Sequence, residues 1–422
     1  MNRTQANAAL AALQNDYSLD IRDPLWPAIR LSKSLMAVLQ TPQVQQLNLI
    51  KQLGPAYLVY PGAMHTRLCH SLGVYYLSWC IVTSLLTRGL GTFLTEEGIR
   101  DFLCASLLHD IGHFPYAHSL KELPLREHEK LATDLILQGN ELTRALDQGG
   151  FNKERICAII DKDRNTSDPQ TLYFRSLLSG ALDPDKLDYL TRDAYFTGVP
   201  YGKQDYSYII SHLTVTKDGK NALLFQAEGS LEQILFSKYQ MYKAVYWHER
   251  VRSATSMIKK SLFTCLKDGT LEPEQLYALD DYSFYSLAQG KKQQLSNVLD
   301  VTFGKLLPCI MEHPYQKNGV LESHCKDIYR RDDLENALCD KLRKQHPELR
   351  RDQIIIDTAE PISFEADIPL VLSDGSTVSF SSHDALFSAD VKARFISALR
   401  KTRIFAPSYI QKSEMEEALA NV

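Results

Sequence analysis

Apolar positions follow a helical period over most of the chain. Residues 70–89 are apolar on most sides, which is typical of a helix buried among other helices. Residues 96–110 repeat this pattern and carry acidic residues in the first turn, where the helix dipole favours them. We expect further helices at 127–138, 171–197 and 230–268, with a less regular helical continuation to residue 346.

Alternating β patterns interrupt the helices in two places. Residues 208–228 alternate β-branched and polar residues around an Asp-Gly pair, which predicts a β-hairpin. Residues 352–383 are rich in β signals, and a short helix follows at 388–401. Residues 45–62 predict a helix that ends at Gly54, followed by a short extended piece. The pattern therefore predicts a mainly α fold with a small β-hairpin insertion, divided into an N-terminal segment 1–29, a helical core 30–270 and a smaller α+β region 271–422.

Composition narrows the class of protein. The 422 residues carry a formal net charge of −4 and are 44% hydrophobic, which is ordinary for a globular protein and gives no strong sign of nucleic-acid binding. None of the eight cysteines forms a C-x-x-C pair, which argues against a thiolate zinc site or a redox motif. The first residues lack an apolar signal segment, and no stretch approaches ~18 uninterrupted apolar residues. We therefore expect a cytoplasmic protein with no membrane span.

Histidines and aspartates gather at the ends of the most apolar helices. Six of the twelve histidines fall between residues 65 and 128, although buried imidazoles and carboxylates are unfavourable unless paired or bound to a metal. A single histidine on an apolar face is usually a satisfied core residue, and an adjacent His-Asp pair is a weak signal. The joint pattern of R-x-x-H, H-D and D-P-D-K-x-D-Y favours a metal site instead. The candidate ligands are His70, His109, Asp110 and Asp185.

This set of ligands indicates a hydrolytic metal centre. Two imidazoles and two carboxylates suit a divalent ion such as Mn, Fe, Mg, Zn or Co and leave positions open for water and phosphate. Arg67 lies three residues before His70, where its guanidinium can bind a phosphate.

Three motifs resemble a known family. The segments HTRLCHSLGV, LLHDIGHFPYAHS and LDPDKLDYLTRD resemble the HD-domain phosphohydrolases, and most of all the deoxynucleoside triphosphate triphosphohydrolases of the dGTPase-like and SAM-and-HD-domain kind. The resemblance runs through residues 40–260 and implies an HD-domain helical core that hydrolyses deoxynucleoside triphosphates to deoxynucleoside and triphosphate. It also implies a homo-oligomer.

The resemblance assigns roles to individual residues. His70, His109, Asp110 and Asp185 would be the metal ligands. A second layer of histidines would lie beside the triphosphate, with one of them protonating the leaving ribose oxygen: His113, His118 and the general acid His128. Arg67, Lys186 and Tyr189 would bind phosphates. The residues around the sugar would be Gln52, Leu53, Asp193 and Tyr246, of which Leu53 and Tyr246 would exclude a 2′ hydroxyl by steric contact.

Two departures from the family pattern matter. Members usually carry an acidic residue three positions after the His118 position, and here that position is Lys121. Glu122 follows directly and is our candidate to orient the catalytic histidine. An activator site for a guanine nucleotide uses an acid and an arginine where this chain has Gln40 and Asn48. Lys51 and the basic run Lys341 to Arg351 remain candidates for another nucleotide effector, although such a run is usually a solvated face.

Three hypotheses about function follow. The first is metal-dependent hydrolysis of deoxynucleoside triphosphates, which Gln52, Leu53 and Tyr246 favour because a monoesterase has no need to crowd a 2′ carbon. The second is an HD phosphodiesterase or phosphomonoesterase that acts on another nucleotide or small phosphate. The third is a catalytically weak nucleotide-sensing protein, which Lys121 favours and the intact metal set disfavours.

Overall fold

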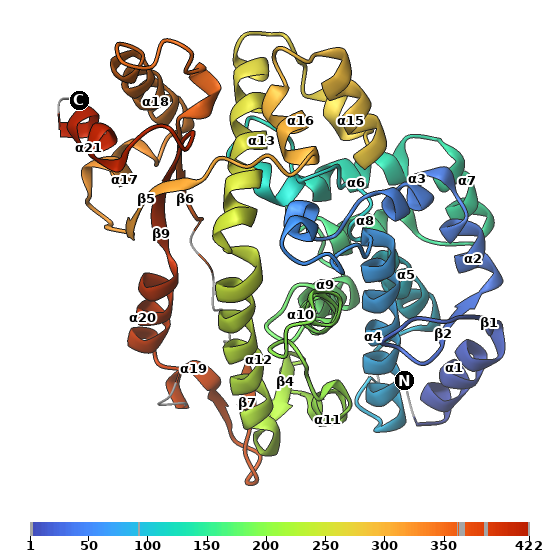
Figure 1. Ribbon diagram of the computed structural model, residues 1–422. Coiled ribbons are helices and arrows are strands. Elements are labelled where there is room, and N and C mark those ends of the chain that lie inside the picture. Colours follow the sequence, from blue (N-terminus) through green and yellow to red (C-terminus); the bar gives the residue numbers. More distant parts are fainter. Residues whose placement is uncertain (1–2, 92, 361, 363–367, 384–386, 421–422) are drawn as a thin grey trace.

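The computed structural model describes residues 3–91, 93–360, 362, 368–383 and 387–420, and helices make up most of this part (Figure 1). As predicted, the fold is mainly α. Helix α4 (Arg67–Thr87) lies in the middle of the core, between α5 (Glu96–Leu108) and α10 (Pro184–Thr197). By length and composition α4 is apolar enough to cross a membrane, but 67% of its most apolar 18-residue window is buried inside the fold.

Capping residues fix where these core helices begin. The side chains of Thr66, Thr95 and Asp183 accept hydrogen bonds from backbone N–H groups in the first turns of α4, α5 and α10. Pro184 then opens α10, where a missing N–H is harmless. Because the caps set the helix starts, they also set which residues of the first turns face the centre of the fold.

Smaller helices cover the outer side of α5. Helix α8 (Lys153–Ile160) packs on α5, and α6 (His128–Leu137), α7 (Glu141–Gln148) and α9 (Pro169–Leu178) pack on α8. The single helix expected at 171–197 is two helices, α9 and α10. The chain turns between them because Gly180 and Pro184 interrupt the helical period.

The N-terminal part contains a strand pair that the sequence pattern did not predict. Strands β1 (Tyr17–Ile21) and β2 (Ile29–Ser32) pair antiparallel, after α1 (Arg3–Asp16) and before α2 (Lys33–Leu39) and α3 (Pro42–Gln45).

The helix expected to end at Gly54 is wrong. Two 3₁₀ turns stand in its place, Gln46–Leu49 and Gly54–Leu58, and the second replaces the expected extended piece. Gly54 has φ +49° and Pro55 follows it, so the backbone starts a new turn there. Between the turns the backbone pairs with residues 65–67: Gln52 N–H donates to the His65 carbonyl at 3.0 Å, and Arg67 N–H to the Ile50 carbonyl at 3.0 Å.

The predicted hairpin is present and extends into a larger sheet. Strands β3 (Leu213–Val215) and β4 (Asn221–Leu224) pair antiparallel around a turn in which Gly219 has φ +81°. Strand β7 (Pro369–Val371) pairs parallel with β4, and β8 (Thr377–Ser379) pairs antiparallel with β7. The sheet therefore joins segments on both sides of residue 270, and the division of the chain into three parts stays a prediction.

The C-terminal region is α+β, as predicted. Helix α12 (Glu228–Met241) continues into a π-helical turn, Tyr242–Tyr246, and then into α13 (Glu249–Lys267). Strands β5 (Cys309–Pro314), β9 (Lys401–Phe405) and β6 (Ile355–Thr358) form an antiparallel sheet in that order. The helices of this region are α14 (Glu274–Tyr277), α15 (Asp281–Gly290), α16 (Ser296–Thr302), α17 (Val320–His324), α18 (Ile328–Leu342), α19 (Phe380–His383), α20 (Ala389–Leu399) and α21 (Lys412–Ala420).

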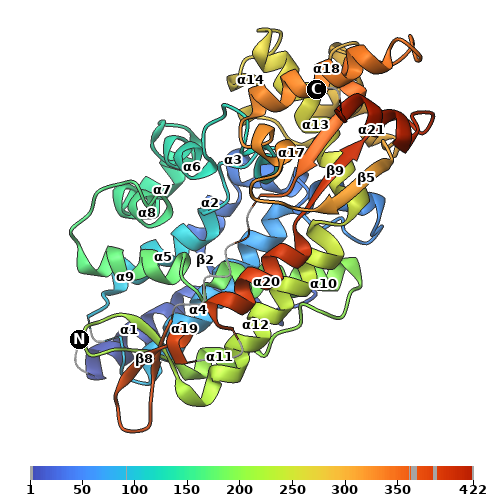
Figure 2. The same cartoon turned by 90° about the vertical axis from the view of Figure 1, so that its left-hand side faces the viewer.

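The C-terminal region packs directly on the helical core. Figure 2 shows α20 alongside α12, and the rings of Tyr239 and Phe395 lie 4.5 Å apart between these helices. Helix α13 contacts β6 on one side and the 3₁₀ turn Ala117–Leu120 on the other. Helix α13 is therefore the element through which the two parts of the chain meet.

Candidate metal centre and substrate site

The four predicted metal ligands come together from three helices. His70 lies in the first turn of α4, His109 and Asp110 follow the end of α5, and Asp185 lies in the first turn of α10. Ligand atoms of His70, His109 and Asp110 lie within 4.8 Å of one another. An Asp185 Oδ1 atom lies 3.0 Å from His70 Nε2 and 4.0 Å from His109 Nε2. The Asp185 side chain is 37% exposed, so the cluster is open to solvent on that side.

The protonation of His109 fits a metal ligand. Its Nδ1–H donates to the Ser106 carbonyl at 2.9 Å, which leaves the lone pair on Nε2. Nε2 is buried and has no hydrogen-bond partner among the described residues, although it faces the other three ligands. A buried acceptor of this kind is unfavourable unless a cation or a hydrogen-bond donor occupies the space in front of it, and the carboxylates around this space favour a cation.

The charges around the cluster also fit a cation. Burial raises the pKa of Asp185, but the hydrogen bond and positive charge of His70 outweigh it and lower the pKa to about 2. Burial also raises the pKa of Asp110, but His113, His109 and Arg67 outweigh it and hold the pKa well below the ordinary value. Both carboxylates are therefore ionised at neutral pH, and the donor set suits a divalent ion.

A buried aspartate that the sequence analysis missed orients His70. Asp188 accepts hydrogen bonds from His70 Nδ1 at 2.8 Å and from Trp26 Nε1 at 2.6 Å, and Arg192 Nε lies 2.9 Å from it. Because Asp188 holds the Nδ1 proton, the Nε2 proton is the one that His70 would lose when a cation binds, and the Nε2 lone pair would then point toward Asp185 and the metal position. A Cβ atom at Gly73 would lie 1.8 Å from Asp188 Oδ1, so this close packing requires glycine. The available sequence signal was the spacing Asp185, Asp188, Arg192 on one predicted helix.

Three further histidines form a layer next to Asp110. The rings of His113 and His128 lie 3.9 Å apart, those of His113 and His118 4.7 Å, and those of His118 and His128 5.3 Å. Nε2 atoms of His113 and His118 are 3.1 Å apart. Burial lowers the pKa of all three, that of His128 to about 4, so they are neutral at pH 7. An Arg67 N–H donates to Asp110 Oδ2 at 2.7 Å and brings a positive charge to this layer.

A third group contains the residues that the resemblance assigns to the sugar. The Asp193 carboxylate accepts a hydrogen bond from Tyr246 OH at 2.6 Å and lies 2.9 Å from His65 Nε2. The backbone of Gln52 is bonded to that of His65, and the buried Oε1 atom of Gln52 has no partner among the described residues.

Tyr189 contacts Tyr246 edge to face, and burial holds the pKa of both phenols well above the ordinary value. Leu53 packs against Ala56, Ala63 and Val251. His65 was not assigned a role from the sequence.

Two predicted residues have other partners in the structure. The Lys186 ammonium bonds to the Asp183 carboxylate and to the Gly180 carbonyl at 2.8 Å, so binding a phosphate requires it to exchange these partners. Glu122, expected to orient a catalytic histidine, pairs with two cations instead: Lys259 Nζ lies 2.5 Å and Arg331 3.0 Å from its Oε2 atom, and its role toward the histidines stays a prediction. Lys259 lies on α13, and Arg331 lies on α18 of the C-terminal region. In contrast, His128 Nδ1 lies 3.2 Å from the Glu129 carboxylate.

Comparison with known proteins identifies the class. Residues 67–193 match the HD domain, and residues 205–398 match the HD associated region. All four candidate metal ligands and the histidine layer lie inside the HD domain. The chain belongs to the HD-domain phosphohydrolase superfamily.

Three relatives show how similar the chain is to known proteins. The deoxynucleoside triphosphate triphosphohydrolase SAMHD1 of Homo sapiens is 28% identical over 326 residues, 69% of this chain and 49% of that protein. An uncharacterized protein of Methanocaldococcus jannaschii is 31% identical over 283 residues, 66% of this chain and 57% of that protein. YwfO of Bacillus subtilis, also uncharacterized, is 33% identical over 277 residues, 64% of this chain and 60% of that protein. The chain thus spans about half of the length of the curated relatives it matches.

Solved structures show the same fold. A phosphohydrolase from Bacteroides thetaiotaomicron superposes with a TM-score of 0.72 at 23% identity, covering 92% of this chain and 99% of the other. A hypothetical protein from Aquifex aeolicus superposes with a TM-score of 0.71 at 24% identity, covering 94% and 99%.

Proposed function

We propose that this HD-domain phosphohydrolase cleaves deoxynucleoside triphosphates into deoxynucleoside and inorganic triphosphate. The observation that carries the proposal is the placement of three groups within one part of the fold: the metal ligands, the histidine layer beside Asp110, and the Asp193–Tyr246 pair. The similarity to deoxynucleoside triphosphate triphosphohydrolases supports the same substrate class. We also infer a homo-oligomer, which light scattering of the purified protein would test.

The reaction divides among residues of this chain. His70, His109, Asp110 and Asp185 would hold a divalent ion, which would supply positive charge against the charge that develops on the phosphate. Arg67 adds a fixed guanidinium beside Asp110 and binds phosphate oxygens. Water adds to the α-phosphorus, the bond from phosphorus to the C5′ oxygen breaks, and His128 gives that oxygen its proton.

The low pKa of His128 fits this role only when substrate is present. The neighbouring charges of Arg67 and Lys121 and the burial of the ring keep the imidazole neutral in the free site. A bound triphosphate brings several negative charges next to the ring, and these raise its pKa. His128 therefore takes up a proton with the substrate and delivers it to the leaving oxygen.

Sugar selection falls to the Asp193 group. Tyr246 and His65 hold both carboxylate oxygens of Asp193, so the carboxylate has a fixed orientation toward a sugar hydroxyl. The buried Oε1 of Gln52, which has no partner among the described residues, is a second candidate acceptor for a sugar hydroxyl. Leu53 and the Tyr246 ring occupy the space beside the 2′ carbon, so a ribose hydroxyl at that carbon is rejected by steric contact.

A substrate panel tests the proposal. Each deoxynucleoside and ribonucleoside triphosphate is incubated with Mn²⁺, Mg²⁺ or Co²⁺, and products are separated by chromatography. We expect deoxynucleoside and intact triphosphate, with ribonucleotides left uncleaved. Asp185→Ala should abolish turnover, whereas Asp163→Ala, which removes an exposed partner of Lys130, should not. Absence of turnover for every triphosphate, singly or in mixtures, would overturn the proposal, and nucleoside monophosphates and cyclic nucleotides would then be tested.

A further inference from the structure

Glu122 lies at the centre of a buried ionic contact, which we call the Glu122 clamp and which consists of Glu122, Lys259 and Arg331. Lys259 Nζ lies 2.5 Å from Oε2, and the two terminal nitrogens of Arg331 lie 3.0 Å and 3.3 Å from the carboxylate oxygens. The Lys259 and Arg331 side chains are each 7% exposed. Burial raises the pKa of Glu122, but the two cations outweigh it and lower the pKa to about 2, so the carboxylate is charged.

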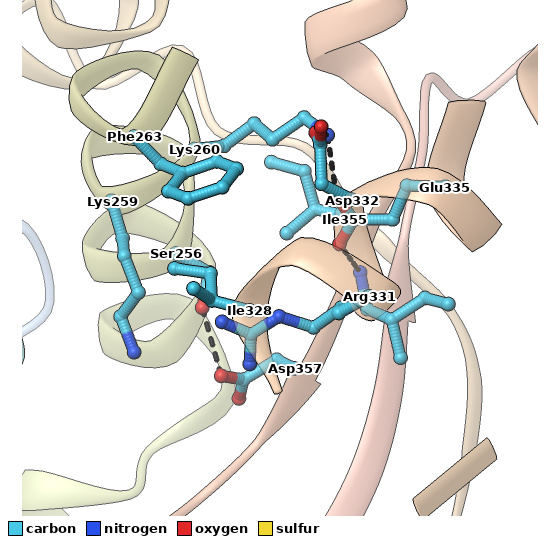
Figure 3. Close-up of a pocket in the computed structure, with 11 residues that line it drawn as sticks. Ser256, Lys259, Lys260, Phe263, Ile328, Arg331, Asp332, Glu335, Ile355 and Asp357 are labelled. Carbon is cyan, nitrogen blue, oxygen red and sulfur yellow. Dashed lines mark hydrogen bonds and ion pairs between the residues drawn. The ribbon is translucent and has the colours of Figure 1, made fainter. Parts of the chain in front are cut away.

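The clamp joins three elements that are far apart in the sequence. Glu122 follows the 3₁₀ turn Ala117–Leu120, which carries His118 of the histidine layer. Lys259 lies on α13 and Arg331 on α18, and both line the narrow pocket drawn in Figure 3. The HD associated region, residues 205–398, therefore supplies both cations that bind the loop.

Apolar packing also holds the loop. Leu120 and Leu123 anchor it on its apolar side, where they pack in the same cluster as Met257 and Ile258 of α13. Apolar contacts are not directional, so they keep the loop packed against α13 but restrain its rotation and its sliding along α13 less strongly. The forked contact of Arg331 with both carboxylate oxygens supplies a direction.

We infer that Glu122 is a positioning residue, through which α13 and α18 hold the His118 loop in register with the rest of the histidine layer. His118 and His113 approach to 3.1 Å between Nε2 atoms, and a small rotation of the loop separates them. The C-terminal region thereby determines the geometry of the active site without touching substrate. This inference rests on the proposed function, since it gives the histidine layer a catalytic role.

A matched set of variants tests the clamp. Glu122→Gln keeps the shape of the side chain and removes its charge, and Arg331→Met removes the forked donor. Lys260→Met is the control, because Lys260 joins α13 to Asp332 and Glu335 of α18 without contacting Glu122. All three substitutions break a buried ion pair of α13 or α18, so all should lower the unfolding temperature.

Kinetics separate positioning from stability. Because a displacement of about 1 Å can cost on the order of 100-fold in rate, we expect Glu122→Gln and Arg331→Met to lower kcat strongly while KM and bound metal stay near wild type. The double variant should be no slower than the slower single variant, and Arg331→Lys should be intermediate. Equal kcat in Glu122→Gln, Lys260→Met and wild type would overturn the inference. If Glu122→Gln does not fold, Arg331→Lys against Lys260→Met provides the same comparison.

A spectroscopic readout keeps the clamp testable if the proposed reaction is wrong. Nitrogen-15 spectra of the imidazole side chains report which ring nitrogens carry protons, and His118→Gln assigns the His118 signals. We expect Glu122→Gln to move the signals of His118 and His113, and Lys260→Met to leave them in place. Unmoved signals in Glu122→Gln would refute the clamp even in a protein with no triphosphate turnover, and moved signals in such a protein would retain it.

Discussion

Replacing Asp188 by asparagine tests how His70 is held. The carboxylate of Asp188 is fully buried and receives donors from His70, Trp26 and Arg192, so every lone-pair direction faces a donor. Asparagine has nearly the same shape, but its NH₂ group would face N–H donors. The amide would also leave Arg192 with Asp23 as its remaining carboxylate partner.

The structure sets the size of the expected effect on metal binding. Without the charged acceptor, His70 no longer prefers to carry its proton on Nδ1. The imidazole can then carry the proton on Nε2, where it blocks metal binding. Changes in groups that orient a metal ligand typically weaken metal affinity ~10–100-fold, equivalent to about 1.4–2.7 kcal/mol. Breaking a buried ion pair also lowers the free energy of unfolding by roughly 3–5 kcal/mol.

Asp101→Asn is the matched control for this experiment. Asp101 is also a buried acid, and it lies on α5, the helix that His109 follows. Its carboxylate accepts hydrogen bonds from Arg155 at 2.8 Å and from the backbone N–H of Asn152 at 3.0 Å. We expect both variants to unfold at lower temperature. Metal titration by calorimetry should show weaker Mn²⁺ binding in Asp188→Asn alone. A metal affinity within twofold of wild type for Asp188→Asn would refute the orienting role of Asp188.

Three further outcomes are expected. His109→Ala should purify without stoichiometric metal, and added Mn²⁺ should no longer raise its unfolding temperature, as calorimetry would show. Tyr246→Phe removes the hydroxyl that donates to Asp193 at 2.6 Å, and kcat/KM for deoxynucleotides should fall about tenfold, because a hydrogen bond to a charged group contributes ~1.5–3 kcal/mol. The pKa of Asp357 and that of Glu122 are lowered to about 2, so the stability these carboxylates contribute is present above their unfolded pKa of ~4 and is lost as the pH falls from ~4 toward 2. Denaturant unfolding between pH 7 and pH 3 should show that loss, and a stability independent of pH in this range would contradict it.

The helical core was predictable because its signals are local. The period of apolar residues, the capping residues Thr66 and Thr95 and the Asp-Pro pair before Asp185 all lie within the helices they define. The region around Gly54 was predicted wrongly because its conformation depends on backbone pairing with residues 65–67, which no local period reports. The β1–β2 pair was missed for a similar reason, since the pattern of 17–32 is too short and irregular to indicate strands.

The site shows the same division. Each metal ligand stands at a helix end that the sequence marks, so their meeting point followed from the motifs. The partners of Glu122 are 137 and 209 residues away in the sequence, and only packing of α13 against α18 and the His118 loop brings them together. Asp188 and His65 contact other side chains of the site, His70 and Asp193 respectively. A single sequence does not distinguish such residues from ordinary buried polar groups.

Hydrolysis in oxygen-18-labelled water, followed by phosphorus NMR, tests the central proposal most directly. With a deoxynucleoside triphosphate and Mn²⁺, we expect intact inorganic triphosphate that carries one labelled oxygen on the phosphorus that was the α-phosphorus, and an unlabelled deoxynucleoside. This result would place water attack at the α-phosphorus and release at the C5′ oxygen. Labelled orthophosphate or pyrophosphate, or a nucleoside monophosphate product, would contradict the assignment of the reaction.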